Sequence, residues 1–174
     1  MEINGREKVL FSRQEISKRV KELGKELSGI YRDKDLVVVS LLRGSFMFCA
    51  DLVRELDIPV EVDFITTASY GHEEVSSGRV EIVHDLRSQL KGKDVLIVDD
   101  IMDSGNTIRK VRDHLLDKEP KSVNICVMLD KPDRRQVELE PDYVGFSIPD
   151  VFIVGYGLNY GDFYRNIPYI FTFD

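Results

Sequence analysis

The sequence predicts a single α/β domain in which a parallel sheet is flanked by helices. Short apolar runs rich in β-branched residues alternate along the chain with segments of helical periodicity, a pattern typical of parallel sheets covered by helices. The chain has 174 residues, 43% hydrophobic and 32% charged, which favours one globular core over a disordered or fibrous chain. Because neither an internal repeat nor a linker divides the chain, we expect residues 1–174 to form one domain.

The N-terminal part of the chain predicts two helices and a strand. Ser12-Arg13-Gln14-Glu15 has the pattern of a capping box. Apolar residues follow it at helical spacing as far as Ile30, which predicts a helix of about five turns. Residues 36–41 form a β-branched apolar run and predict a buried strand. A second helix is expected from Gly44-Ser45 onward, with one face formed by Phe46, Cys49, Ala50 and Val53.

The rest of the chain predicts further strands and a helix. Residues 60–65 alternate in polarity like a strand, and residues 80–83 suit a strand that returns toward it. Residues 66–78 contain Gly, Ser, His and Glu and indicate a long mobile loop. A helix is expected from about 107 to 116. The remaining buried strands are expected over 95–98, 123–129, 143–146 and 151–154.

Charge and composition exclude several classes of partner. The formal charge is −7, from 31 acidic and 24 basic residues, so nucleic acid and anionic membranes are unfavourable partners. The N-terminus lacks the apolar core of a secretory signal, and no apolar run is long enough to span a bilayer. Cys49 and Cys126 lie in apolar stretches and form no CxxC pair, which favours buried thiols in a reducing cytoplasm.

The most informative segment follows the strand expected over 95–98. Asp99 and Asp100 end that strand, and a loop of small residues then opens a helix. Ligands of open α/β sheets bind beyond the carboxyl ends of the strands. The loop can turn its N–H groups inward at a helix N-terminus, and its hydroxyl groups add further donors, which suits a phosphate monoester. The phosphate-binding residues that we expect are Asp103, Ser104, Gly105, Asn106 and Thr107.

The two carboxylates at the strand end need a different ligand, because they would repel a phosphate. Asp99 and Asp100 can accept hydrogen bonds from vicinal sugar hydroxyls, directly or through a metal ion. The whole segment therefore predicts a cradle for ribose 5-phosphate. Solvated turn residues are the ordinary alternative for each feature taken alone. A phosphoacceptor receiver domain also carries a strand ending in Asp-Asp, but there the pair ends the first strand, whereas about ninety residues precede it here.

Residues 95–107 resemble the phosphoribosyl-diphosphate motif of type I phosphoribosyltransferases. Further segments between about 36 and 168 resemble the hypoxanthine-guanine branch of that family: Leu42-Arg43-Gly44, Ser69-Tyr70, Lys131-Pro132, 151–157 and 164–168. The resemblance implies the type I phosphoribosyltransferase fold, with a small hood formed by the terminal segments. It also implies a Mg²⁺-dependent, cytoplasmic purine-salvage transferase that joins hypoxanthine or guanine to 5-phosphoribosyl 1-diphosphate, giving IMP or GMP and pyrophosphate. The family's habit is a homodimer or homotetramer.

The resemblance assigns roles around the purine base. Asp103 matches the carboxylate near purine N7, which can accept a proton as a general base; a helix N-cap is its ordinary alternative. Lys131 matches the lysine that donates to the exocyclic O6 and so favours 6-oxopurines, against a solvated surface lysine. Phe152 matches the ring that stacks on the base, against a core strand residue, and Ile153 offers its backbone groups to the base edge.

The resemblance also places the leaving group, the covering loop and the metal. In the family, the turn Leu42-Arg43-Gly44 receives pyrophosphate, often with a non-proline cis peptide bond, and most relatives have Lys where this chain has Arg43. Arg165 matches an arginine that meets pyrophosphate, and Ser69-Tyr70 the tip of the loop that closes over the sugar. Asp99, Asp100 and Asn159 match metal positions. Asn159 departs from the family's Asp, so we expect weaker binding of a second magnesium ion.

Two other functions stay open at this stage. A non-enzymatic regulator could use the same fold to sense the nucleotide and bind nucleic acid, but it would need a basic face that the charge of −7 disfavours. A transferase for xanthine or another base is the second alternative. The apolar run 169–173 can pack on the core or on a partner, and the sequence does not choose between them.

Overall fold

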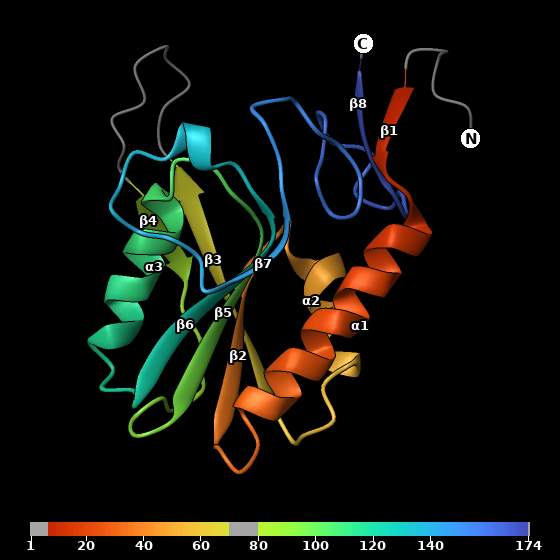
Figure 1. The fold of residues 1–174 in the computed structure, drawn as a ribbon. Helices are drawn as coiled ribbons and strands as arrows, with labels where there is room; N and C mark the ends of the chain where they lie inside the picture. The colour runs from red at the N-terminus through yellow and green to blue at the C-terminus, as the bar shows by residue number, and fades with distance from the viewer. Residues whose placement is uncertain (1–6, 70–79, 174) are drawn as a thin grey trace.

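A six-stranded, mostly parallel sheet forms the centre of the protein in the computed structural model, which describes residues 7–69 and 80–173 (Figure 1). The strand order is β4-β3-β2-β5-β6-β7, and every neighbouring pair is parallel except β3 and β4. The expectation of a parallel sheet is therefore confirmed. The strands are β2 (Leu36–Leu42), β3 (Glu61–Ser69), β4 (Val80–His84), β5 (Asp94–Met102), β6 (Ser122–Asp130) and β7 (Tyr143–Ser147).

Helices cover both faces of the sheet. Helices α1 (Arg13–Ile30) and α2 (Phe46–Arg54) pack on one face and α3 (Asn106–Leu116) on the other, as Figure 1 shows. The apolar face expected for α2 was wrong in part. Of the four residues expected there only Cys49 is fully buried, and Val53 is partly buried against the same core. The other fully buried positions are Phe48 and Leu52, because the packed stripe begins one residue earlier, at the buried Ser45. None of the helices in the described ranges combines the length and hydrophobicity that crossing a membrane requires.

The capping box predicted for the first helix is confirmed. The amide of Glu15 donates to Ser12 Oγ at 3.2 Å, and the amide of Ser12 donates to Glu15 Oε2 at 2.8 Å. Each bond satisfies an amide that has no partner inside the helix, so the pair defines where α1 begins. The helix then runs for 18 residues, which is the predicted five turns.

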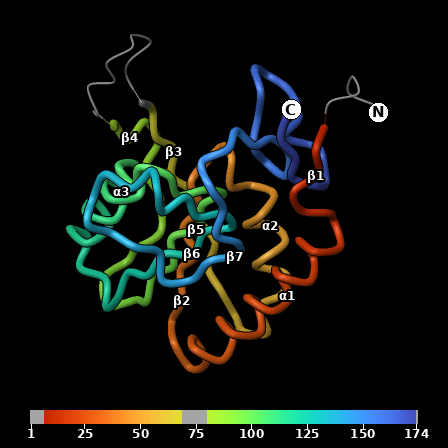
Figure 2. The backbone as a smooth tube through the Cα atoms, turned by 45° about the horizontal axis from the view of Figure 1, so that its top comes forward, coloured from red at the N-terminus to blue at the C-terminus, as the bar shows by residue number. Residues whose placement is uncertain are grey.

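A second, two-stranded sheet builds the hood. Strands β1 (Glu7–Phe11) and β8 (Ile170–Phe173) pair antiparallel beside each other above α1 (Figures 1 and 2). The C-terminal run 169–173 thus packs within this chain, where Ile170 and Phe171 are fully buried. The strand expected over 151–154 was wrong. Only Val154 pairs, in an isolated bridge to Phe171, because this stretch buries single side chains in the hood rather than extending along a neighbour.

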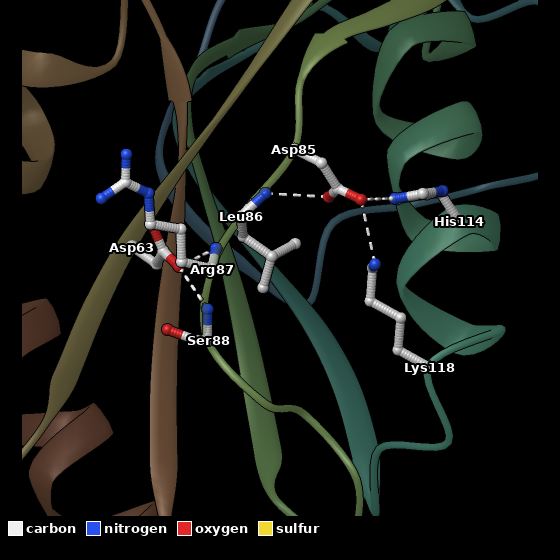
Figure 3. A network of polar contacts seen from close by, with 7 residues as sticks. All are labelled: Asp63, Asp85, Leu86, Arg87, Ser88, His114 and Lys118. Atoms are coloured by element: carbon white, nitrogen blue, oxygen red, sulfur yellow. Dashed lines mark hydrogen bonds and ion pairs between the residues drawn. The ribbon is translucent and has the colours of Figure 1, made fainter.

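The hairpin formed by β3 and β4 is longer than predicted and is fastened to α3. Residues 66–69, expected in a loop, belong to β3, and 70–79 lie outside the described residues. Asp63 accepts hydrogen bonds from the amides of Arg87 and Ser88, both at 2.7 Å, just after β4 (Figure 3). Asp85 bonds to the side chains of His114 on α3 and of Lys118 just after that helix, both at 2.9 Å. These contacts hold the base of the hairpin against α3 and the turn that follows it.

Candidate active site

Asp99 and Asp100 lie on β5 just beyond the point where β2 stops pairing with it, while β6 on the other side continues to pair. Strand β2 pairs with β5 as far as Ser40 and Val98, whereas β6 pairs with β5 to its end at Met102 and Asp130. Strand β5 therefore continues through residues 101 and 102, although the sequence suggested that it ends at Asp99 and Asp100. On the side of β2 the sheet opens, and the turn after β2 faces the acidic pair.

The turn after β2 directly abuts the acids. The peptide bond between Leu42 and Arg43 is cis, as the family resemblance led us to expect. At Gly44, a Cβ atom would overlap the carboxylate of Asp100, so this position has no room for a side chain. The turn thereby presents its backbone beside Asp100, while Arg43 is exposed. The expected leaving-group turn and the expected sugar-binding acid thus meet at one place.

The loop after β5 lines a cavity of about 190 Å³ together with Asp99, Asp100 and the first residues of α3. Gly105 is the N-cap of α3 and has a φ of 82°, which favours glycine. A Cβ there would also lie 2.7 Å from a methyl group of Val137. Asp103 is therefore not the helix cap. Its side chain is exposed, and its Oδ1 accepts a hydrogen bond from the amide of Ser104 at 2.6 Å.

The two adjacent carboxylates of β5 are crowded and mostly shielded from water. Asp99 is only 8% exposed, and burial raises its pKa well above the ordinary value, with a further increase from the charge of Asp100. Burial also raises the pKa of Asp100, although its hydrogen bonds and the charge of Arg165 act in the opposite direction. A buried carboxylate beside a half-buried one, both with raised pKa values, favours a cation or hydroxyl donors nearby.

Lys131 and Phe152, which the resemblance assigns to the purine, are buried and exposed in the reverse of what their ordinary alternatives require. The Lys131 side chain is 11% exposed, donates to the carbonyl oxygen of Val151 at 2.6 Å and lies 3.7 Å from Asp150, so it is not a solvated surface lysine. Phe152 is 55% exposed and meets Tyr160 edge-on, with ring centroids 5.8 Å apart. It is therefore not a core strand residue, and its ring is free to stack. Ile153 is buried behind it.

The hood reaches the turn after β2. Gly157 packs so closely on the carbonyl group of Gly44 that a Cβ there would overlap it. Arg165 Nη1 donates to the carbonyl oxygen of Gly157 at 2.6 Å, which brings this arginine to the same region. Asn159 is exposed and donates to the carbonyl oxygen of Gly161 at 2.6 Å. Ser69 ends β3, and Tyr70 lies outside the described residues.

The support that residues 131–136 give to the expected phosphate-binding loop, residues 103–105 before α3, was not predicted from the sequence. The amides of Lys131 and Gln136 donate to the carbonyl oxygens of Met102 and Ser104, both at 2.9 Å. Between them, Arg135 contacts Asp103. The one signal was the Arg134-Arg135 pair shortly after Lys131, which is also what an ordinary solvated turn contains.

A parallel sheet with an acidic strand end, a small-residue loop and a helix N-terminus defines a phosphoribosyltransferase site. The family model described as "Phosphoribosyl transferase domain" matches residues 8–161. The chain belongs to this family, and it has the type I phosphoribosyltransferase fold.

Its similar proteins place it among the hypoxanthine phosphoribosyltransferases. The hypoxanthine phosphoribosyltransferase of Salmonella typhimurium is 52% identical over 93% of this chain and 92% of its own. The hypoxanthine-guanine phosphoribosyltransferase of Bacillus subtilis is 46% identical over 94% and 91%. A crystal structure of a Staphylococcus aureus hypoxanthine phosphoribosyltransferase, 41% identical, covers 99% of this chain and 97% of its own with a TM-score of 0.93.

Proposed function

We propose that this chain is a purine-salvage enzyme that transfers the phosphoribosyl group of 5-phosphoribosyl 1-diphosphate to hypoxanthine or guanine, giving IMP or GMP and pyrophosphate. The observation that carries the proposal is a convergence at one edge of the sheet. The acidic end of β5 faces the turn after β2, and the phosphate loop and Lys131 are joined by backbone hydrogen bonds. Each of these parts suits a different portion of the two substrates.

The phosphoribosyl group has a matching set of donors and acceptors. Residues 103–105 precede α3, and Asn106 and Thr107 form its first turn, where the free amides and the partial positive charge favour the 5-phosphate. The carboxylates of Asp99 and Asp100 accept hydrogen bonds from the ribose hydroxyls. They also place negative charge near the positive charge that develops on the sugar as its C–O bond breaks.

Four residues contact the purine base in this proposal. The exposed ring of Phe152 stacks on the purine, and backbone groups of Ile153 meet its edge. The ammonium group of Lys131 donates to O6 of a 6-oxopurine. Asp103 accepts the proton from N7 as N9 attacks the sugar, which is the part of a general base.

The pyrophosphate leaving group meets cationic and backbone donors. The turn Leu42-Arg43-Gly44 presents its backbone and Arg43, and Arg165 approaches from the hood. Ser69, the last residue of β3, and Tyr70 after it begin the segment that we propose closes over the sugar. Closure excludes water from a carbon centre that water could otherwise attack.

The residues at the end of β5 fit a magnesium ion. Among the described residues, no three His, Cys, Asp or Glu side chains form a metal site. Asp99 and Asp100 do supply hard oxygen ligands, and Mg²⁺ commonly combines one or two carboxylates with waters and substrate phosphates. Such an ion, when bound, neutralises charge on the pyrophosphate. Asn159 offers an uncharged oxygen for a second ion.

We extend the proposal to organisation and location. Residues 1–174 act as one domain, and the chain forms a homodimer or homotetramer. A cavity of about 600 Å³ beside the hood is lined in part by the exposed rings of Phe46 and Phe163, and this apolar surface is available for contact with a second copy of the chain. The free, buried thiols of Cys49 and Cys126 suit a cytoplasmic protein. The charge of −7 argues against nucleic acid and anionic membranes as partners.

One assay tests the proposed function. Purified protein is incubated with Mg²⁺ and 5-phosphoribosyl 1-diphosphate and offered hypoxanthine, guanine, xanthine and adenine separately, and nucleotide and pyrophosphate are quantified. We expect IMP and GMP, and little or no AMP. Turnover of xanthine alone would favour the related transferase. No nucleotide from any base would contradict an enzymatic function and favour a regulator.

A further inference from the structure

Arg135 contacts the phosphate loop from the end of the short helix η1 (Pro132–Arg134). Its Nη1 donates to the carbonyl oxygen of Asp103 at 2.5 Å. Its Nη2 forms an ion pair with Asp130 at the end of β6, and Glu140 lies 3.4 Å from the same nitrogen. The Arg135 side chain is only 9% exposed. A single buried guanidinium group thus joins a strand end to the loop.

One peptide group connects Arg135 to the Asp103 carboxylate. The carbonyl oxygen of the Asp103–Ser104 peptide accepts from Arg135, and the N–H of the same peptide donates to Asp103 Oδ1 at 2.6 Å. The peptide is planar and rigid, so the bond on its carbonyl side restricts the direction of its N–H. Hydrogen bonds in such a chain also polarise one another. Arg135 therefore acts on the orientation of this carboxylate without touching it.

Three hydrogen bonds to the segment 131–136 fix the orientation of the peptide groups in this loop. The carbonyl groups of Met102, Asp103 and Ser104 all accept hydrogen bonds from the segment 131–136. Because the C=O and N–H of a trans peptide point in opposite directions, the amides of these peptides point away from that segment. Two of the three bonds come from backbone amides, which any substitution short of proline leaves in place. Arg135 supplies the only one of the three that a side chain makes.

The arginine is held at this place at a cost. Its Nε is buried and has no hydrogen-bond partner among the residues that the structure describes, and an unsatisfied buried donor lowers stability. Burial also lowers the pKa of Arg135, but hydrogen bonds to Asp130 and Glu140 outweigh that effect and raise it overall. The guanidinium group is thus always charged. Because burying it costs stability, its role in orienting the Asp103–Ser104 peptide explains its position better than a gain in stability does.

We infer that Arg135 is a positioning residue for the transfer reaction. It holds the Asp103 carboxylate in place through the Asp103–Ser104 peptide. The two backbone bonds already join the loop to the segment that carries Lys131, and Arg135 adds the bond that fixes the Asp103–Ser104 peptide itself. The inference rests on the proposed function, in which Asp103 and Lys131 meet the same purine.

The test compares Arg135→Lys with Arg134→Lys, a matched change at the exposed preceding residue. A lysine at 135 keeps a charge for Asp130, but its one nitrogen cannot occupy both guanidinium positions. We expect kcat to fall about tenfold, with the KM for 5-phosphoribosyl 1-diphosphate and the melting temperature nearly unchanged. Arg134→Lys should match the wild type. If Arg135→Lys does not fold, Arg135→Gln is measured in the same way.

A double-mutant cycle separates positioning from general damage. In an Asp103→Asn background, the substitution at Arg135 should lower kcat by less than about twofold, because its effect passes through the carboxylate. Equal losses in both backgrounds, or an unchanged kcat in the single variant, would overturn the inference while leaving the proposed function intact. A wild type without turnover on any purine would overturn both.

Discussion

The ammonium group of Lys131 donates a hydrogen bond to the carbonyl oxygen of Val151, 2.6 Å away. Val151 directly precedes Phe152, so the bond ties the end of β6 to the segment that carries the exposed ring. An ammonium group has three donors, and the bond to Val151 uses one. The remaining donors make Lys131 suited to a carbonyl group on a purine that stacks on Phe152, and unsuited to an amino group.

Substitution of Lys131 should therefore reduce the selectivity for 6-oxopurines. Lys131→Met removes the donor but keeps the apolar stem, and a hydrogen bond to a charged donor contributes about 2 kcal/mol. We expect kcat/KM for hypoxanthine to fall roughly 30-fold, so that the ratio of hypoxanthine to adenine turnover falls with it. Steady-state rates on both bases measure the ratio. If adenine is still rejected as strongly, Lys131 is not the discriminator.

Replacement of the proposed base should affect the chemical step more than binding. Asp103→Asn keeps an oxygen that can accept from the Ser104 amide but cannot take a proton. General-base catalysis commonly contributes at least about 100-fold, and we expect a loss of that order in kcat. The affinity for IMP, measured by calorimetry, should stay within about threefold, because the asparagine oxygen keeps the hydrogen bond from the Ser104 amide and the loop keeps its shape. Asp113→Asn, at an exposed position on α3, is the control. Unchanged turnover in Asp103→Asn would exclude the assignment.

The parts of the fold that the sequence predicted are those with local patterns. For the Ser12–Glu15 capping box and the apolar runs of β2, β5 and β6, a pattern of a few consecutive residues is enough to predict the structure. The pairing of β1 with β8 joins opposite ends of the chain, and no local pattern records such a contact. The same limit explains the wrong strand over 151–154, where hood packing decided the backbone.

The candidate site divides in the same way. Asp99, Asp100 and the loop 103–107 were predictable because they form one continuous segment at a strand end. The exposure of Phe152 was not predictable from its apolar sequence neighbours, because only the folded hood determines which side of that segment is in contact with water. Arg135 was missed because its contact with the loop is to Asp103, 32 residues earlier in the chain, and no local pattern records that contact.

A methyl group at Gly44 should disturb the site from the side of the leaving group. The added Cβ would overlap the Asp100 carboxylate, and one of the two must move. We expect Gly44→Ala to lower the free energy of unfolding by about 1–3 kcal/mol and to weaken binding of 5-phosphoribosyl 1-diphosphate. Gly29→Ala is a matched control, because nothing lies within 4 Å of a Cβ at that helical position. The control should raise the free energy of unfolding by up to about 1 kcal/mol. Equal effects of the two changes on ligand affinity would refute the close approach of Gly44 and Asp100.

Restoring a carboxylate at position 159 should change the requirement for magnesium. Asn159 is exposed on the hood and offers only an uncharged oxygen, whereas a carboxylate adds charge to the same ligand set. We expect Asn159→Asp to lower the Mg²⁺ concentration for half-maximal activity roughly threefold to tenfold, with Asn159→Ala as the uncharged control. Activity is titrated with Mg²⁺ at a fixed, saturating concentration of 5-phosphoribosyl 1-diphosphate. An identical titration for the two variants would show that this position does not contribute to metal binding.

The Asp63 carboxylate should make the stability of the hairpin depend on pH. Burial tends to raise its pKa, but hydrogen bonds from the amides and side chain after β4 and from Phe64 lower it overall (Figure 3). A carboxyl group whose pKa is lower in the folded state adds stability above its unfolded pKa of about 3.9. That stability is lost as the pH falls through the folded pKa. Asp63→Asn should therefore lower the free energy of unfolding by about 1–2 kcal/mol at pH 7 and by less at pH 3. Urea unfolding at the two pH values measures both, with Asp113→Asn as the control. A loss that is equal at pH 7 and pH 3 would mean that the charge of Asp63 does not hold the base of the hairpin.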